Sequence, residues 1–320
     1  MSVKSLDTSH RNAFVFAPKK RQRVELPVAR LPTQTLLSLP ITVIHGREEG
    51  PTLWLSAAIH GDELNGVEII RQVVQQLSAG NLRGTLIAVP IVNIFGFLQQ
   101  SRYLPDRRDL NRCFPGSPKG SLASRLAHLF MEEIVSRSTH GIDLHTASDS
   151  RTNLPQIRAN LKHEETARFA RAFGAPAMLH SNTRDGSLRE AAGKKGIPVL
   201  LYEGGEALRF DTEVIRIGVE GVFRAMTALE MLSAITIDPV AESIEVDSSK
   251  WVRASRSGIL RLSITLGDRV KKRQIIGKIF DAFGETTVSV RANITGLVIG
   301  HTQNPLINQG DAIVHIAVLS

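Results

Sequence analysis

The sequence predicts an α/β fold, with a mixed, largely parallel sheet flanked by helices and a small C-terminal all-β domain. Between residues 50 and 235, short apolar runs alternate with helical patterns, which is typical of parallel strands joined by helices. Polar residues that can bind a metal follow three of these apolar runs. From Ile244 onward the pattern changes to short alternating runs punctuated by glycines, which indicates antiparallel strands.

The composition narrows the class of protein. The chain has 320 residues, of which 42% are hydrophobic, enough for a sizeable core and about two domains. Its net charge of +8 favours anionic ligands, whereas 5% aromatic residues are too few for a nucleic-acid stacking surface. The single cysteine, Cys113, is typical of a reducing compartment. No signal peptide or membrane-spanning run is evident, so we expect a soluble, cytoplasmic protein that binds neither membrane nor nucleic acid.

Hydrophobic periodicity predicts the elements of the first domain, residues 23–240, which follows a flexible arm over residues 1–22. Alternating patterns predict antiparallel strands at residues 23–30 and 36–45, with a turn at residues 46–51. Continuous apolar runs predict buried strands, and apolar residues spaced three and four apart predict helices. These strands are expected at residues 52–58, 85–90, 141–145, 177–180 and 198–202, and the helices at residues 64–77, 122–135, 164–173, 187–195 and 214–235.

Residues 241–320 are predicted to form the β domain, and its two halves are similar in sequence. Residues 257–279 and 294–316 each contain a glycine-led apolar strand, a Gly-Asp pair and a closing apolar strand. This repeat resembles the barrel-sandwich fold of biotinyl and lipoyl carrier domains. The hairpin that would carry their lysine, residues 281–287, has none. We therefore expect a structural or oligomerising role, consistent with a homo-oligomer, and no swinging arm.

The stretch over residues 52–66 has the strongest functional pattern. It combines a buried strand, the polar turn His60-Gly61-Asp62-Glu63 and the start of a helix. Open α/β sheets bind ligands where such strands end, and a histidine and a glutamate three residues apart can converge on one metal ion. The alternative is a surface turn in which Asp62 or Glu63 caps the helix.

His145 and Glu203 also follow predicted strands, so the carboxyl ends of a parallel sheet would bring them to the same edge as His60. Two histidines and one glutamate, with an open fourth position, are a ligand set of catalytic zinc. Either Glu63 or Glu203 fits as the third ligand, which leaves the other as a base. Asp143 could orient His145 or hydrogen-bond to a loop backbone.

The long loop over residues 93–120 is rich in proline, glycine and arginine, and loops of that length in a compact domain are commonly functional. Arginine's planar fork suits a carboxylate, so the loop can clamp an anionic substrate, although a solvated basic loop is the alternative. Its arginines are Arg102, Arg107, Arg108 and Arg112. Cys113 suggests a thiol nucleophile, but no base is evidently paired with it.

Four short motifs occur in a fixed order. They are HGDE at residues 60–63, DLNR at residues 109–112, DLHT at residues 143–146 and YEGG at residues 202–205. Over residues 50–235 this series resembles the succinylglutamate desuccinylase/aspartoacylase family, which has the zinc-carboxypeptidase fold. The resemblance implies one zinc ion per chain, with His60, Glu63 and His145 as its ligands.

The resemblance also implies roles for the other polar residues. Asn111 and Arg112 would clamp a substrate carboxylate, and Glu203 would be the general base. Arg102 matches the arginine that polarises the scissile carbonyl, with Arg107 or Arg108 as alternatives.

The activity implied is that of a zinc metallohydrolase that cleaves the amide bond of a small anionic N-acyl amino acid. Aspartoacylase-like and desuccinylase-like reactions are both open, as is deacylation of a diamino acid. The alternatives are a small-peptide metallocarboxypeptidase and a catalytically silent ligand-binding module.

Overall fold

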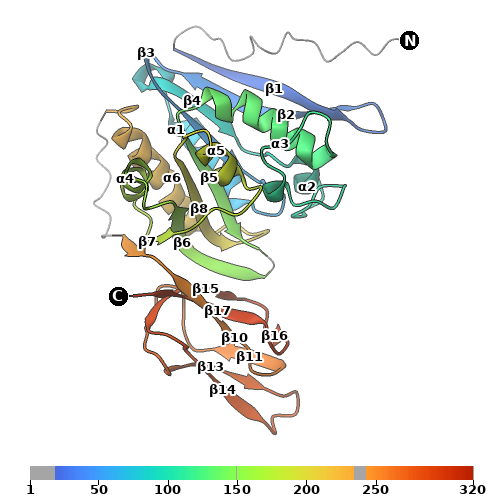
Figure 1. The fold of residues 1–320 in the computed structure, drawn as a ribbon, viewed down its shortest axis with the longest axis vertical. Coiled ribbons are helices and arrows are strands. Elements are labelled where there is room, and N and C mark those ends of the chain that lie inside the picture. Colours follow the sequence, from blue (N-terminus) through green and yellow to red (C-terminus); the bar gives the residue numbers. More distant parts are fainter. Residues whose placement is uncertain (1–18, 149, 234–242, 320) are drawn as a thin grey trace.

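The computed structural model describes residues 19–148, 150–233 and 243–319. The predicted arm over residues 1–22 lies outside the described residues as far as residue 18, and Lys20 already begins the first strand. Figure 1 shows a large sheet covered by helices, with the C-terminal strands extending from one end. Among the described residues, no helix combines the length and apolar character that a membrane crossing requires.

Within residues 19–148 and 150–233, the structure describes eight strands and six α-helices. The strands are β1 (Lys20–Arg30), β2 (Leu36–His45), β3 (Glu48–Ala57), β4 (Arg83–Val89), β5 (His140–Ala147), β6 (Arg151–Ala159), β7 (Ala177–His180) and β8 (Val199–Glu206). The helices are α1 (Asn65–Gln76), α2 (Ile94–Leu98), α3 (Leu122–Glu133), α4 (Glu164–Phe173), α5 (Leu188–Gly193) and α6 (Thr212–Ala228). Short 3-10 turns lie at Ala79–Asn81, Leu110–Arg112 and Val135–Arg137.

The large sheet has the strand order β1-β2-β4-β3-β5-β8-β6-β15-β17-β10, and β7, β9 and β12 pair beside this path. Its centre is parallel, because β4, β3, β5 and β8 run in the same direction. β1 and β2 are antiparallel at one end, and β6, β15, β17 and β10 are antiparallel at the other. The predicted mixed, largely parallel sheet is therefore confirmed.

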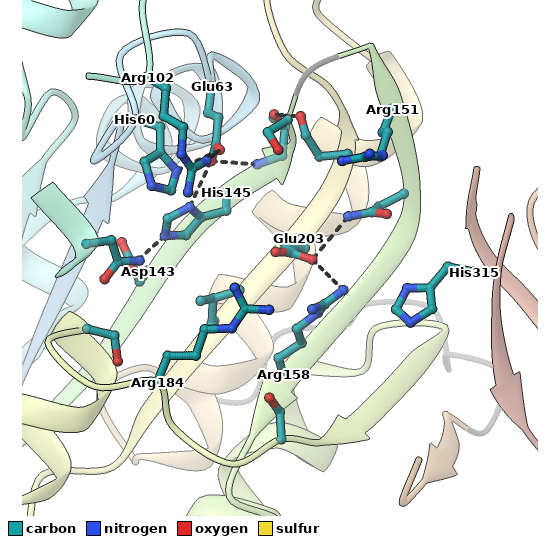
Figure 2. A pocket seen from close by; sticks show the side chains of 18 of the residues that line it. His60, Glu63, Arg102, Asp143, His145, Arg151, Arg158, Arg184, Glu203 and His315 are labelled. Atoms are coloured by element: carbon teal, nitrogen blue, oxygen red, sulfur yellow. Dashed lines mark hydrogen bonds and ion pairs between the residues drawn. The ribbon is translucent and has the colours of Figure 1, made fainter. Parts of the chain in front are cut away.

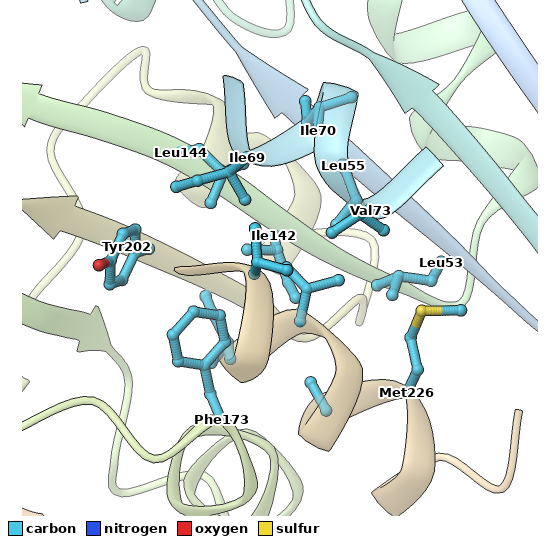
Figure 3. Packing of buried hydrophobic residues seen from close by; sticks show 14 of the residues in the cluster. Leu53, Leu55, Ile69, Ile70, Val73, Ile142, Leu144, Phe173, Tyr202 and Met226 are labelled. Atoms are coloured by element: carbon cyan, nitrogen blue, oxygen red, sulfur yellow. The ribbon is translucent and has the colours of Figure 1, made fainter. Parts of the chain in front are cut away.

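Apolar side chains fill both faces of this sheet. On one face, α1, α4 and α6 pack over the central strands, and α2, α3 and α5 cover the opposite face. Figure 3 shows Ile69, Ile70 and Val73 of α1 packed against Leu55 and neighbouring strand residues. Burying each such side chain contributes about 1.5–3 kcal/mol, so this packing fixes where the loops at the strand ends lie.

The structure corrects several predicted elements. The main omission is β6, whose arginine, asparagine, glutamine and Pro155 interrupt the apolar pattern expected of an inner strand. The turn predicted at residues 46–51 is shorter, because β3 begins at Glu48, and α6 ends at Ala228 rather than at residue 235. The loop over residues 93–120 also contains α2 and a 3-10 turn.

Over residues 243–319, the regular elements are all strands. They are β9 (Ile244–Val246), β10 (Ser249–Arg253), β11 (Gly258–Leu262), β12 (Arg269–Val270), β13 (Ile275–Phe280), β14 (Thr287–Arg291), β15 (Gly296–Thr302), β16 (Leu306–Ile307) and β17 (Ala312–Val318). Four of them form a second, antiparallel sheet in the order β14-β13-β11-β16. β15 pairs with β6, with Gly300 opposite Asn153, so the large sheet continues into this part without a break.

Gly141 allows the close packing of β3 against β5. A Cβ atom at this position would overlap the ring of Trp54, which is fully buried. We expect Gly141→Ala to lower the free energy of unfolding by about 1–3 kcal/mol, because the core must shift to admit the methyl group. Urea denaturation measures this loss. Gly193→Ala is the matched control, since a Cβ there meets no atom within 4 Å; equal stability of the two variants would contradict the packing argument.

Candidate active site

The structure brings together the three residues of the predicted metal site. His60 follows β3, Glu63 precedes α1, and His145 lies within β5, the parallel neighbour of β3. One ligand atom from each lies within 4.8 Å of the others, and all three side chains are buried. Figure 2 shows them converging at one end of a pocket. A buried set of two histidines and one carboxylate is suited to a divalent cation that keeps an open position.

The carboxylate of Glu63 lies at the centre of this group. Its Oε1 lies 2.7 Å from Nδ1 of His60, and its Oε2 lies 2.8 Å from Nδ1 of His145. The backbone N–H of Thr146 donates to Oε2 at 3.1 Å. Burial opposes ionisation of Glu63, but the charges of His60 and His145 outweigh it and lower its pKa. Positive charge therefore compensates the carboxylate, and a metal ion can supply that charge in place of the protons.

The second nitrogen of each histidine faces another carboxylate. Nε2 of His145 lies 2.7 Å from Asp143, which also accepts a hydrogen bond from Ser56 at 2.8 Å. Burial acts to lower the pKa of His145, but Asp143 and Glu63 raise it well above its usual value. Nε2 of His60 lies 3.2 Å from Asp109. Such contacts fix the ring orientation of metal-binding histidines, so both Nδ1 atoms are held toward the same point.

Arg102 is the loop arginine that reaches this group. Its Nε and Nη2 donate to Asp109 at 3.2 and 2.9 Å, and its Nη1 lies 3.5 Å from Glu63. The two alternatives, Arg107 and Arg108, are exposed and do not line the pocket. Asp109 therefore holds both His60 and Arg102, a function that the sequence analysis missed although the residue opens the DLNR motif.

Glu203 lies beside the candidate metal-binding group of His60, Glu63 and His145 and is not part of it. In the paired strands β5 and β8 it is opposite His145, and it lies within β8 rather than after its end. Its Oε2 accepts a hydrogen bond from Asn153 at 3.1 Å and forms an ion pair with Nη2 of Arg158 at 2.9 Å. Both partners come from β6, the strand that was not predicted. The geometry therefore groups Glu63 with His60 and His145 and leaves Glu203 facing the pocket (Figure 2).

Asn111 and Arg112 also line the pocket, from the 3-10 turn of the long loop. The side chain of Asn111 is buried and accepts a hydrogen bond from the backbone N–H of Leu188 at 2.9 Å. The guanidinium of Arg112 donates to the carbonyl oxygen of Asn111. Cys113 donates to the carbonyl oxygen of Asp109 at 3.3 Å, and burial raises the pKa of its thiol, which disfavours a nucleophilic thiolate.

The pocket has a volume of about 380 Å³ and extends from the metal-binding group to the C-terminal strands. Its lining is strongly cationic, with three carboxylates, Glu63, Asp143 and Glu203, that are all paired. Its arginines are Arg102, Arg112, Arg151, Arg158, Arg184, Arg189 and Arg253. The sequence analysis missed the last five, because they are isolated in the chain and only the sheet order brings them together.

Comparisons with known proteins agree with this geometry. A family model, described as the succinylglutamate desuccinylase/aspartoacylase catalytic domain, matches residues 49–229. The N-alpha-acetyl-L-2,4-diaminobutyric acid deacetylase of Halomonas elongata is 28% identical over 292 residues, which covers 87% of this chain and 85% of that protein. The succinylglutamate desuccinylase of Photorhabdus laumondii is 33% identical over 231 residues, which covers 61% of this chain and 65% of that protein.

Solved structures share the fold over nearly the whole chain. A succinylglutamate desuccinylase/aspartoacylase from Rhodobacter sphaeroides has a TM-score of 0.83 at 25% identity, covering 94% of this chain and 96% of that one. The product-bound ectoine utilization protein EutE (DoeB) from Ruegeria pomeroyi has a TM-score of 0.84 at 24% identity, covering 93% and 95%. The chain thus belongs to the succinylglutamate desuccinylase/aspartoacylase family and is a hydrolase of the kind that cleaves amide C–N bonds of N-acyl amino acids.

Proposed function

We propose that this chain binds one zinc ion through His60, Glu63 and His145 and removes the acyl group from an N-acyl amino acid with a free carboxylate. The observation that carries the proposal is the convergence of these three side chains next to Glu203 in one arginine-lined pocket. The nitrogen and oxygen donors, their burial and the carboxylates behind both histidines fit zinc.

Each residue has a distinct task in the proposed reaction. A bound zinc ion lowers the pKa of a water from about 15.7 to near 7 and polarises an acyl carbonyl. Glu203, held through Oε2 by Arg158 and Asn153, takes a proton from the attacking water and passes it to the departing amine. Arg102 donates to the acyl oxygen as negative charge develops there, and removing such a donor costs about 3–4 kcal/mol.

The test is a screen of N-acyl amino acids against the purified protein, with zinc content measured in parallel. We expect one zinc per chain, cleavage of at least one N-acyl amino acid, and loss of cleavage after treatment with a chelator. Cleavage of small peptides in preference to N-acyl amino acids would instead indicate a carboxypeptidase. A protein without stoichiometric zinc or hydrolysis would be a binding module, which would refute the proposal.

We expect Arg112 to bind the free carboxylate of the substrate. Asp106, which could otherwise pair with Arg112, accepts a hydrogen bond from the backbone N–H of Ala123 and pairs with Arg108. Asp109 already pairs with His60 and Arg102. We expect amidation of that carboxylate to lower kcat/KM on the order of 10²-fold, because two charge-assisted hydrogen bonds are lost. Arg112→Lys should lose most of this preference, since lysine has no planar fork.

Measuring kcat/KM for free and amidated forms of the same substrate checks this prediction. Arg108→Lys, an exposed arginine of the same loop outside the pocket, is the control and should keep the wild-type preference. If Arg112 only braces the loop, Arg112→Lys will lower stability while the preference stays unchanged.

A further inference from the structure

Gly300 lies where a C-terminal strand meets one of the residues that hold the proposed base. It is on β15 and pairs with Asn153 of β6. A Cβ atom at Gly300 would lie 2.5 Å from Oδ1 of Asn153 and 3.2 Å from the carbonyl oxygen of Thr152. The first separation is far inside van der Waals contact, whereas the second requires only a slight adjustment. Any side chain at Gly300 would therefore displace the amide of Asn153.

Space, and not backbone conformation, accounts for a glycine at this position. The pairing of β15 with β17 is irregular between Val298 and Gly300, and some bulges of this kind need glycine because they contain a positive φ. Among the described residues, Gly300 is not one of those with a positive φ, so other residues could adopt its backbone conformation. What glycine provides here is the absence of a side chain.

The strands around Gly300 are held together, so they do not move apart easily to admit a side chain. Gln156 of β6 is fully buried, and its Nε2 donates to the carbonyl oxygen of Ile299 at 3.2 Å. Gly300 is also buried, and β15 pairs with β17 on its other side. The end of the Asn153 side chain can rotate while these backbones cannot, so it is the group that would yield.

Asn153 transmits such a shift to Glu203. Its amide carbon carries both Oδ1, which faces Gly300, and Nδ2, which donates to Oε2 of Glu203 at 3.1 Å. Nη2 of Arg158 pairs with the same oxygen at 2.9 Å, and Figure 2 marks both contacts with dashed lines. Within the part of the chain that the structure describes, Oε1 has no such partner, which leaves it free to take a proton. The two contacts to Oε2 therefore set the direction in which Oε1 points.

We propose that Gly300 is a positioning residue for the base and that it acts through Asn153. By presenting no side chain, Gly300 lets the Asn153 amide hold Glu203 at the angle that proton transfer requires, an assignment that rests on the proposed deacylase function. A misplacement of about 1 Å can cost about 10²-fold in rate, so a small rotation of Glu203 is enough to slow the reaction. Residues 243–319 then contribute to catalysis through β15 as well as through the pocket wall.

The experiment compares Gly300→Ala, Asn153→Ala and the double variant with the wild-type enzyme, on the N-acyl amino acid that the wild type cleaves fastest. Each single variant should lower kcat about tenfold, the loss expected for one hydrogen bond to a charged group. Gly300→Ala should leave KM and zinc content unchanged. The double variant should be no slower than Asn153→Ala alone, because the added methyl group then has no amide to displace.

A stability measurement separates positioning from folding. Because only the end of a side chain has to move, the urea midpoint of Gly300→Ala should not fall below that of the wild type. Gly193→Ala is the matched control for both measurements, since a Cβ there meets no atom within 4 Å. A Gly300→Ala protein that unfolds or loses its zinc would show a structural requirement and overturn the proposal. An unchanged kcat, or losses that multiply in the double variant, would overturn it as well.

Failure of the deacylase proposal would give a different result. A wild-type protein that cleaves no N-acyl amino acid, or a Glu203→Gln variant with full activity, would remove the base and with it the task of Gly300. If the wild type is active and Glu203→Gln is slow, the base stands, and a Gly300→Ala variant with the wild-type rate overturns the positioning by Gly300 alone.

Discussion

Glu203→Gln should lower kcat by about 10²–10⁴-fold while the protein keeps its zinc. Glutamine is nearly the size of glutamate and can still meet Arg158 and Asn153, but it cannot take a proton from the attacking water. The structure favours this outcome because the ligand atoms that converge belong to His60, Glu63 and His145, with Glu203 alongside. Steady-state kinetics and elemental analysis of the same preparation measure both quantities.

The control for this variant is Glu206→Gln. Glu206 ends the same strand, pairs with Arg209 at 3.5 Å and does not line the pocket, so its amide variant should keep full activity. Loss of zinc from Glu203→Gln would make Glu203 a ligand and would require a different function for Glu63.

His145→Ala should lose its zinc and, with it, measurable hydrolysis. One of three protein ligands disappears, and Asp143 and Glu63 both lose a buried hydrogen-bonding partner. Leaving buried carboxylates unpaired is costly, so we also expect the free energy of unfolding to fall by about 3–5 kcal/mol. Zinc analysis, kinetics and urea denaturation measure the three effects.

His140→Ala provides the comparison for this effect. His140 begins the same strand and lies 3.3 Å from Glu165, and it is not part of the pocket. That variant should retain its zinc and its activity. A folded His145→Ala protein with one zinc per chain would remove His145 from the metal site.

The sequence was sufficient to predict the parallel centre of the fold and the convergence of His60 and His145 with a glutamate at one edge of the sheet. Buried parallel strands read as continuous apolar runs, and the first polar residue after such a run lies at the sheet edge where ligands bind. That rule located His60, and it grouped His145 and Glu203 with it although both lie inside their strands. The assignment of Glu63 as a ligand needed the family resemblance, because either glutamate satisfied the spacing.

The surroundings of the site could not be predicted in the same way. β6 supplies Asn153 and Arg158 to Glu203, but its side chains are polar toward the pocket, so its pattern does not resemble that of a buried strand. The end of the pocket lined by Arg253 and His315 depends on the pairing of β15 with β6 and of β10 with β17, which are contacts between residues far apart in the chain. Local periodicity contains no information on such partners, so these pocket residues emerge only from the three-dimensional structure.

The pairing of β6 with β15 also bears on whether the N-terminal part can be produced without the C-terminal strands. Without residues 243–319, the backbone N–H and C=O groups of β6 near Asn153 would become an open sheet edge, and such edges template aggregation. Asn153 also holds Glu203, so fraying of that edge would loosen the residue proposed to move the proton. The C-terminal strands therefore cover the edge of the sheet that carries the site, and we expect the N-terminal part to aggregate if it is produced without them.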